Sequence, residues 1–192
     1  MIIGLTGSMG SGKGELVKIL QGKGFKYVRL SDMVREEARK RGLTQEREVL
    51  QDIGNGMRAA GGTGVLAAKA LEKAKNEGGD FVIDGIRNPG EITELRQGHG
   101  HEDCGAVYIV GIGVDKDVLV KRILGRGREG DSEERDAILA KIDRELGVGE
   151  PLDGQQVGKC MQEADIVIEN NGDLKELHDR FMDYFNPISD AR

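Results

Sequence analysis

A glycine-rich segment ending in a lysine is the clearest chemical signal in the chain. Gly7-Ser-Met-Gly-Ser-Gly-Lys13 follows the apolar run Met1-Ile-Ile-Gly-Leu-Thr6. This spacing is typical of a loop between a strand and a helix, in which glycines let backbone N–H groups turn toward a polyphosphate. Lys13 would reach the outer phosphates, and the N-terminus of the adjoining helix favours negative charge. The competing interpretation is an ordinary turn in a chain with 30 glycines.

The residue after the lysine departs from the usual phosphate-binding pattern. Gly14 stands where a Ser or Thr hydroxyl commonly binds Mg²⁺, so one expected metal ligand is missing. A helical run begins at the next residue, Glu15. We expect the loop to bind ATP through residues Gly7, Ser8, Met9, Gly10, Ser11, Gly12, Lys13, Gly14 and Glu15.

Arginines near the ends of predicted elements are the next candidates, because phosphoryl transfer spreads negative charge that positive side chains must stabilise. Asp32 and Arg35 lie three residues apart at the start of a predicted helix, hence on one face, where they could clamp an acceptor phosphate. A surface ion pair is the competing interpretation. Arg58 ends the segment Gly54-Asn-Gly-Met-Arg58, whose glycines would admit a base or ribose, or mark helix crossings.

The segment Asp84-Gly-Ile-Arg87 follows the apolar run Phe81-Val-Ile83. This places Asp84 at the carboxyl end of a predicted sheet, where open α/β folds bind ligands. A carboxylate there can hold Mg²⁺ through water, Gly85 would let a phosphate or ribose approach, and Arg87 would face the transferred group. The alternative is a helix cap by Asp84 with a solvated Arg87.

Two later segments complete the candidate site. Arg122, Arg126 and Arg128 lie on and just after the predicted helix over residues 116–125, in a glycine-rich stretch typical of a lid that closes on ATP. For each arginine alone, a solvated basic surface is an equally good interpretation. Asn170-Asn-Gly172 follows the last predicted strand and could receive a purine edge or simply form a turn.

These candidates require strands that end at one edge of a sheet, separated by helices. Apolar or alternating runs predict strands over residues 1–6, 25–30, 80–84, 106–114 and 165–169. Helical spacing predicts helices over residues 14–20, 33–41, 44–58, 65–75, 116–125 and 131–146. Ser31 and Asp32 are expected to cap the second of these. The pattern predicts one α/β domain over residues 1–192, a mostly parallel five-stranded sheet with helices on both faces.

Composition narrows the class of partner. The net charge of −6, the absence of a Lys/Arg run and an aromatic content of 4% argue against a nucleic-acid polymer. Cys104 and Cys160 lack metal-site spacing and are expected to be reduced, structural thiols. No apolar segment approaches membrane-spanning length and no leader precedes the first strand, so we expect a cytoplasmic protein without membrane partners.

Taken together, these motifs resemble the P-loop nucleoside monophosphate kinase superfamily, which includes adenylate, deoxynucleotide and dephospho-coenzyme A kinases. The likeness covers nearly the whole chain. It is carried by the loop with its glycine after the lysine, by Asp32-Met-Val-Arg35, by Asp84-Gly-Ile-Arg87, by Lys121-Arg-Ile-Leu-Gly-Arg126 and by Ala164-Asp-Ile-Val-Ile-Glu-Asn170. The chain departs from adenylate kinases where Glu15 replaces a threonine, and in a short lid without zinc cysteines.

The resemblance implies a three-layer P-loop fold with an acceptor-binding helical insertion at about residues 31–78 and a lid at about residues 126–150. Catalytic roles on ATP and the transferred phosphate fall to Lys13, Arg87, Arg122, Arg126 and Arg128. The implied acceptor-binding residues are Asp32, Arg35, Arg58, Asp84, Gly85 and Arg87. Asp84 would hold Mg²⁺, and the adenine loop would comprise Asn170, Asn171 and Gly172.

The implied reaction transfers the ATP γ-phosphate to a nucleoside or deoxynucleoside monophosphate. A phosphate acceptor is already anionic and needs no general base, which suits the three acceptor arginines. A dephospho-coenzyme A kinase would instead need a carboxylate, Asp32, to take the proton of a ribose hydroxyl. A nucleotide-binding regulatory protein without turnover is a further alternative, motivated by Gly14 and Glu15, and an ATPase acting on a protein or RNA partner is another.

Overall fold

The computed structural model describes residues 1–98, 106–126 and 134–191. Within them one sheet has the strand order β2-β3-β1-β4-β5, and every neighbouring pair is parallel. The strands are β1 (Ile2–Thr6), β2 (Lys26–Arg29), β3 (Phe81–Ile86), β4 (Val107–Gly113) and β5 (Ile166–Glu169). Each overlaps the strand predicted for it, and the predicted five-stranded α/β fold is confirmed.

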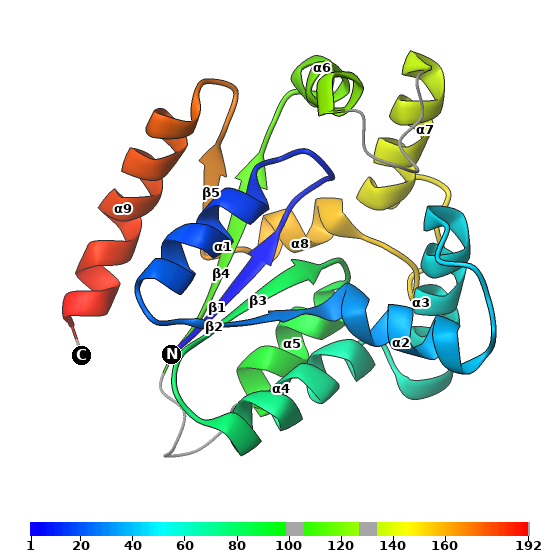
Figure 1. Ribbon diagram of the computed structural model, residues 1–192, viewed down its shortest axis with the longest axis horizontal. Coiled ribbons are helices and arrows are strands. Elements are labelled where there is room, and N and C mark those ends of the chain that lie inside the picture. Colours follow the sequence, from blue (N-terminus) through cyan, green and yellow to red (C-terminus); the bar gives the residue numbers. More distant parts are fainter. Residues whose placement is uncertain (99–105, 127–133, 192) are drawn as a thin grey trace.

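Helices connect the strands and cover both faces of the sheet (Figure 1). They are α1 (Lys13–Gly22), α2 (Leu30–Lys40), α3 (Arg47–Gly61), α4 (Val65–Glu77), α5 (Pro89–Gly98), α6 (Lys116–Arg126), α7 (Arg135–Leu146), α8 (Val157–Glu163) and α9 (Leu174–Asp190). Three of them, α2 to α4, lie consecutively between β2 and β3, as the predicted insertion requires.

The expected start of α2 is wrong. Ser31 and Asp32 do not cap it, because the helix already begins at Leu30 and its N-cap is Arg29, which makes no side-chain capping hydrogen bond. Leu30 and Val34 both belong to the buried face of α2. A helix that presents both apolar side chains to the core at a spacing of four residues must start by Leu30.

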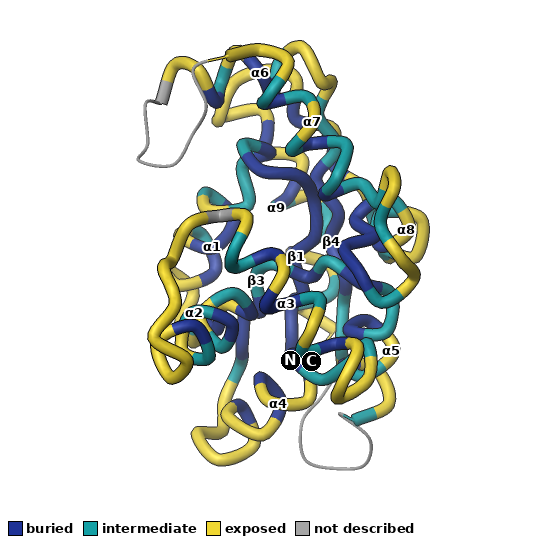
Figure 2. The backbone as a smooth tube through the Cα atoms, turned by 90° about the vertical axis from the view of Figure 1, so that its right-hand side faces the viewer, coloured by how far each residue is buried: buried dark blue, intermediate teal, exposed yellow. Residues whose placement is uncertain are grey.

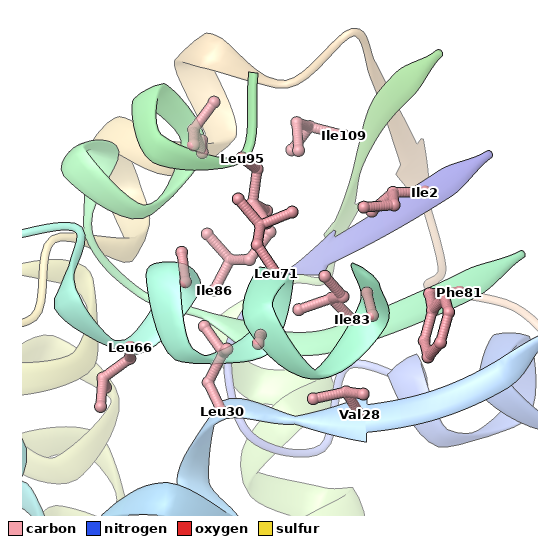
Figure 3. Packing of buried hydrophobic residues seen from close by; sticks show 14 of the residues in the cluster. Ile2, Val28, Leu30, Leu66, Leu71, Phe81, Ile83, Ile86, Leu95 and Ile109 are labelled. Atoms are coloured by element: carbon pink, nitrogen blue, oxygen red, sulfur yellow. The ribbon is translucent and has the colours of Figure 1, made fainter. Parts of the chain in front are cut away.

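Alternation along the strands creates a hydrophobic cluster on each face of the sheet. On one face Ile2, Phe81 and Ile83 pack against α2, α4 and α5 (Figure 3). On the other face Ile3 and Leu5 pack against α1 and α9. Burial on both faces holds the parallel strands in register, so that their carboxyl ends meet at one edge.

A third, smaller cluster joins α6 and α7 to the loop that follows β1. Met9 of that loop packs with Leu119 and Ile123 of α6 and with Ile138 and Ile142 of α7. Figure 2 shows α6 and α7 projecting at one end of the molecule, beyond the buried strands. The predicted lid at about residues 126–150 includes residues 127–133, which lie outside the described part of the chain, and α7, which the cluster ties to the loop.

The expectations drawn from composition concern cysteines and membranes. Cys160 is a buried free thiol, and burial raises its pKa, so it stays protonated at neutral pH. Cys104 lies outside the described residues. No helix in the described ranges is long and apolar enough to cross a membrane.

Candidate functional site

The loop between β1 and α1 has the backbone that its glycines predict. Gly7, Gly10 and Gly12 have φ angles of 137°, 77° and 105°, a region that favours glycine. A Cβ added to Gly7 would lie 2.7 Å from the carbonyl oxygen of Ile112, and one added to Gly12 would lie 2.5 Å from Nδ2 of Asn170. Glycine is therefore needed both for the turn and for the close approach of the loop to the ends of β4 and β5.

Lys13 begins α1, and its side chain folds back to the loop. Its Nζ donates hydrogen bonds to the carbonyl oxygens of Gly7 and Ser8, at 2.6 and 2.8 Å. The ammonium group is thus held beside the loop, the place from which a loop lysine reaches a polyphosphate. The carboxylate of Glu15 pairs with Lys18 one turn further along α1, at 2.9 Å, which offsets its negative charge near the loop.

The segment after β5 holds the loop in place. Nδ2 of the buried Asn170 donates to the carbonyl oxygen of Ser11, at 2.8 Å. Oδ1 of Asn171 accepts from the backbone N–H of Asp115, at 2.8 Å. The predicted adenine loop and the predicted phosphate-binding loop are therefore neighbours in space, and the amide of Asn170 connects them.

Arg122 is the arginine of the predicted lid group whose side chain the structure describes. It lies on α6, and its guanidinium donates to the carbonyl oxygen of Gly172, at 3.0 Å. This contact brings a predicted ATP arginine to the predicted adenine loop. Arg126 is the last residue of α6, and Arg128 lies outside the described residues.

A cavity of about 570 Å³ lies between the helical insertion and the end of β3. Its volume is in the range of small-molecule sites. The insertion provides apolar lining from Leu30, Val34, Leu50 and Leu66. The cavity also brings together the predicted acceptor residues Arg35, Arg58, Gly85 and Arg87. Residues from three separate elements of the sequence thus meet around one space with an apolar and a cationic part.

One buried carboxylate connects this cavity to the phosphate-binding loop. Oε1 of Glu145, on α7, accepts from Nη1 of Arg87 at 2.8 Å, and Oε2 accepts from the backbone N–H of Met9, also at 2.8 Å. The Glu145 side chain is 1% exposed and that of Arg87 is 26% exposed. Burial has the largest single effect and lowers the pKa of Arg87, but the charge and hydrogen bond of Glu145, together with the charges of Asp84 and Glu91, raise the pKa overall, so the guanidinium stays charged.

The other two cavity arginines differ in how strongly the protein holds them. Arg58 is buried, and its Nε and Nη2 lie 2.9 and 2.8 Å from Oε1 of Glu91, so this cation is already paired. Nη1 of Arg35 donates to Oε1 of Gln45 at 3.4 Å, whereas its buried Nε has no hydrogen-bond partner among the described residues. Arg35, and Arg87 with a side chain 26% exposed, are thus better placed than Arg58, which is 3% exposed, to contact an anionic ligand.

Asp84 and Gly85 lie within β3, at an irregularity of the sheet. The pairing of β1 with β3 passes from Leu5 opposite Asp84 to Thr6 opposite Ile86, which leaves Gly85 as the extra residue, with a φ angle of 91°. Gly85 reaches the cavity lining through this bulge.

The carboxylate of Asp84 has one occupied and one open acceptor. The hydroxyl of Tyr27 donates to Oδ2 at 3.3 Å, while Oδ1 is buried without a hydrogen-bond partner in the described structure. Burial, and next the charge of Asp84, raises the pKa of Tyr27 to about 12, so the phenol remains a donor at neutral pH. An open, buried carboxylate oxygen fits a Mg²⁺ ion held through water.

Asp32 does not join this constellation. Its exposed carboxylate accepts from Nε of Arg29 at 3.1 Å, and it is not part of the cavity lining. The structure therefore does not pair Asp32 with Arg35, although both lie on α2. Within the described residues, no group of three or more His, Cys, Asp and Glu side chains could hold a metal ion by itself.

Three functional candidates were missed in the sequence: Gln51, Glu145 and Gln155. Gln51 and Gln155 line the cavity, and Oε1 of Gln155 accepts from Nη1 of Arg87 at 2.8 Å. Glu145 is one of several acidic residues on a charged helix, and the glutamines belong to no motif. The one available signal was the apolar spacing of α7, which places Glu145 seven residues after the buried Ile138 and hence on the same face.

Comparison with known proteins agrees with this architecture. A family model described as an AAA domain matches residues 6–138. The UPF0200 protein of Pyrococcus horikoshii is 34% identical over 180 residues, covering 92% of this chain and 91% of the relative. The UPF0200 protein of Sulfurisphaera tokodaii is 32% identical over 177 residues, covering 92% of this chain and 90% of the relative.

Solved kinase structures share the fold. Shikimate kinase from Bacteroides thetaiotaomicron aligns with a TM-score of 0.58 at 16% identity, covering 97% of this chain and 98% of the other. Dephospho-CoA kinase from Campylobacter jejuni aligns with a TM-score of 0.53 at 16% identity, covering 99% of this chain and 98% of the other. The near full-length similarity to relatives above 30% identity places this chain in the UPF0200 family, more than half of the chain matches the AAA-domain model, and its fold is the one seen in these kinase structures.

Proposed function

We propose that the protein is an ATP-dependent phosphotransferase, a nucleoside or deoxynucleoside monophosphate kinase. The observation that carries this proposal is the position of Glu145, which contacts both the backbone of Met9 in the phosphate-binding loop and the guanidinium of Arg87 in the cavity, each at 2.8 Å. A single side chain therefore spans from the proposed donor site to the proposed acceptor site. Phosphoryl transfer requires that closeness.

The donor side of the site would be formed by the loop, Lys13 and Arg122. The loop N–H groups and the ammonium of Lys13 would bind the phosphates of ATP, while Arg122 lies beside the predicted adenine loop. Bound Mg²⁺ would supply charge neutralisation of the phosphates, and the open Oδ1 of Asp84 is the carboxylate oxygen suited to hold it through water. Gly14 offers no side-chain ligand to replace it.

The acceptor side favours a phosphorylated substrate. Arg35 and Arg87 line the cavity, and guanidinium groups match phosphate oxygens in charge and geometry. Asp32 lies outside the lining, which weakens its candidacy as a general base for a ribose hydroxyl. We therefore place a monophosphate ahead of dephospho-coenzyme A.

One observation favours a hydroxyl acceptor as the second candidate. Glu145 is a buried carboxylate at the junction of the two sites, where a base could take a proton from a hydroxyl group. Both of its oxygens already accept hydrogen bonds, from Met9 and Arg87, so this candidate ranks second.

The test is ADP formation from Mg²⁺ and ATP with each ribo- and deoxyribonucleoside monophosphate, and separately with dephospho-coenzyme A. Lys13→Ala should abolish ADP formation, and the matched control Lys18→Ala, on the same helix but exposed, should retain it. ADP formed with a monophosphate supports the proposal, and ADP formed with dephospho-coenzyme A alone supports the hydroxyl acceptor. ATP binding without ADP from any acceptor would refute both and favour the regulatory alternative.

A further inference from the structure

Glutamine side chains contribute much of the polar lining of the cavity, and each of them points its oxygen at an arginine. Oε1 of Gln45 accepts from Arg35 at 3.4 Å, and Oε1 of Gln155 accepts from Arg87 at 2.8 Å. Oε1 of Gln51 accepts from Nη1 of Arg144, on α7, at 3.1 Å. Since a guanidinium only donates hydrogen bonds, the atom that faces it must be the amide oxygen. Each amide therefore has its NH₂ group left for other partners.

Gln51 is the member of this set whose NH₂ group most needs a partner. The residue is 7% exposed, it lines the cavity, and its Nε2 is buried without a hydrogen-bond partner in the described structure. Arg144 itself is held by Asp52 at 2.7 Å and by Glu150 at 2.8 Å. The orientation of the Gln51 amide is therefore set by a fixed guanidinium, and its Nε2 is left as an unpaired donor buried in the wall of the cavity that Gln51 lines.

The buried polar lining consequently offers donors. Gln51, Arg58 and Gln155 are 7%, 3% and 4% exposed, and the acceptor oxygens of the two glutamines are already occupied by arginines. The carboxylate of Glu46 also borders the cavity, but that residue is exposed, so water competes for its oxygens. A ligand that buries its polar edge against Gln51 must present an acceptor there, because a second donor would leave two buried N–H groups unpaired.

Gln51 shares the helical insertion with the apolar lining of the cavity. It is on α3, one residue after Leu50, and the apolar lining from Leu30, Val34 and Leu66 comes from the same insertion. Arg87 enters from the end of β3, next to the phosphate-binding loop. For a nucleotide whose phosphate contacts Arg87, we place the base against this apolar lining and Gln51.

We infer that the acceptor is a monophosphate whose base has carbonyl oxygens and no amino group at its pairing edge, namely a uridine or thymidine monophosphate. This inference rests on the proposed function. Uracil and thymine present the acceptor O4 at the position where cytosine presents an NH₂ donor, and adenine also presents an NH₂ donor. The NH₂ group of Gln51 can donate a hydrogen bond to O4 of uracil or thymine. In cytosine or adenine it would face a second donor and remain unpaired.

The sharpest comparison is between UMP and CMP, which have almost the same size. Wild-type protein should bind UMP more tightly than CMP and show at least about a tenfold higher kcat/KM with it, since a site with a buried hydrogen-bonding group discriminates strongly against a mismatched partner. Binding is measured by calorimetric titration without ATP, and turnover by ADP formation. dTMP and AMP form a second pair for the same comparison, in which dTMP should be preferred to AMP.

Gln51→Glu converts the donor into an acceptor with little change in shape. One carboxylate oxygen still accepts from Arg144, and the other replaces Nε2, so the preference should shift toward CMP by at least about tenfold. Gln51→Met removes the donor without adding charge and should bring the ratio of UMP to CMP close to one. Gln45→Glu adds the same charge at the exposed cavity rim and should weaken both nucleotides by similar factors.

The outcomes separate this inference from the proposed function. A preference for UMP that Gln51→Glu reverses supports the inference. Turnover of CMP or AMP in preference to UMP, or a ratio unaffected by both Gln51 variants, overturns the inference while leaving a monophosphate kinase. If no monophosphate binds or is phosphorylated while dephospho-coenzyme A is, the proposed function fails first, and the inference fails with it.

Discussion

The ion pair between Arg87 and Glu145 should be one of the strongest single couplings in the protein. Both side chains are removed largely from water, with exposures of 26% and 1%, and Nη1 and Oε1 lie 2.8 Å apart. A hydrogen bond to a charged group contributes about 1.5–3 kcal/mol. Because Arg87 retains some contact with solvent, we expect a coupling free energy of about 2 kcal/mol between the two side chains.

Removal of Glu145 alone should cost more than this coupling. Glu145→Ala also leaves the backbone N–H of Met9 without its acceptor, which adds about 1–3 kcal/mol for an unpaired buried donor. We therefore expect Glu145→Ala to lower the free energy of unfolding by about 4 kcal/mol. Arg87→Ala should lower it by a similar amount, because it leaves the carboxylate of Glu145, 1% exposed, without its cation.

Urea unfolding of the wild type, both single variants and the double variant gives the coupling directly. The same cycle on Arg135 and Asp117, whose side chains are 55% and 73% exposed, is the control and should give less than about 1 kcal/mol. A coupling between Arg87 and Glu145 no larger than that of the control would refute the buried ion pair, and with it the link between loop and cavity on which the proposed function depends.

Three further predictions concern single residues. Arg87→Ala should lower kcat by at least about 100-fold and change the Kd of ATP far less, since Arg87 lines the acceptor cavity. Steady-state kinetics measures kcat and ATP titration measures the Kd. Unchanged turnover would contradict this prediction. Gly14→Ser should raise the free energy of unfolding by about 0.5 kcal/mol, because this exposed helical glycine has no atom within 4 Å of an added Cβ. Urea denaturation measures this change, and a lower free energy of unfolding in the variant would contradict the prediction. Tyr27 should titrate with a pKa of about 12 rather than 10.0, so the free energy of unfolding should fall as the pH rises from 10 to 12. In alkaline denaturation, the Tyr27→Phe variant should lack the part of this fall that comes from Tyr27.

The loop and the sheet were predictable because their signals are local. The conformation of residues 7–13 depends on glycines at fixed spacing, and the structure gives Gly7, Gly10 and Gly12 the positive φ angles that this requires. The strands alternate or run apolar because neighbouring side chains point to opposite faces, which the two core clusters reflect. The resemblance to P-loop kinases rested on these local patterns, and the AAA-domain match and the fold shared with shikimate kinase agree with it.

Local patterns alone could not decide which polar residues share the site. Asp32 and Arg35 have the spacing of a helical pair, yet Asp32 contacts Arg29 and only Arg35 lines the cavity, because the direction of α2 against the sheet separates them. The capping prediction at Ser31 failed for a related reason, since burial of Leu30 outweighs the local preference for a polar cap.

By itself, the sequence determined the glycine-rich loop after β1, the five strands of the sheet, and six helices, α1 to α4, α6 and α7, but not α5, α8 or α9. It also provided a set of candidate arginines near the ends of these elements. Only the tertiary structure decided that Glu145, 136 residues after Met9, closes the distance between loop and cavity, and that Gln51 presents a donor rather than an acceptor. The physical reason is that a hydrogen bond between distant segments depends on how α3 and α7 pack, whereas a glycine turn or an apolar strand depends on neighbours in the chain.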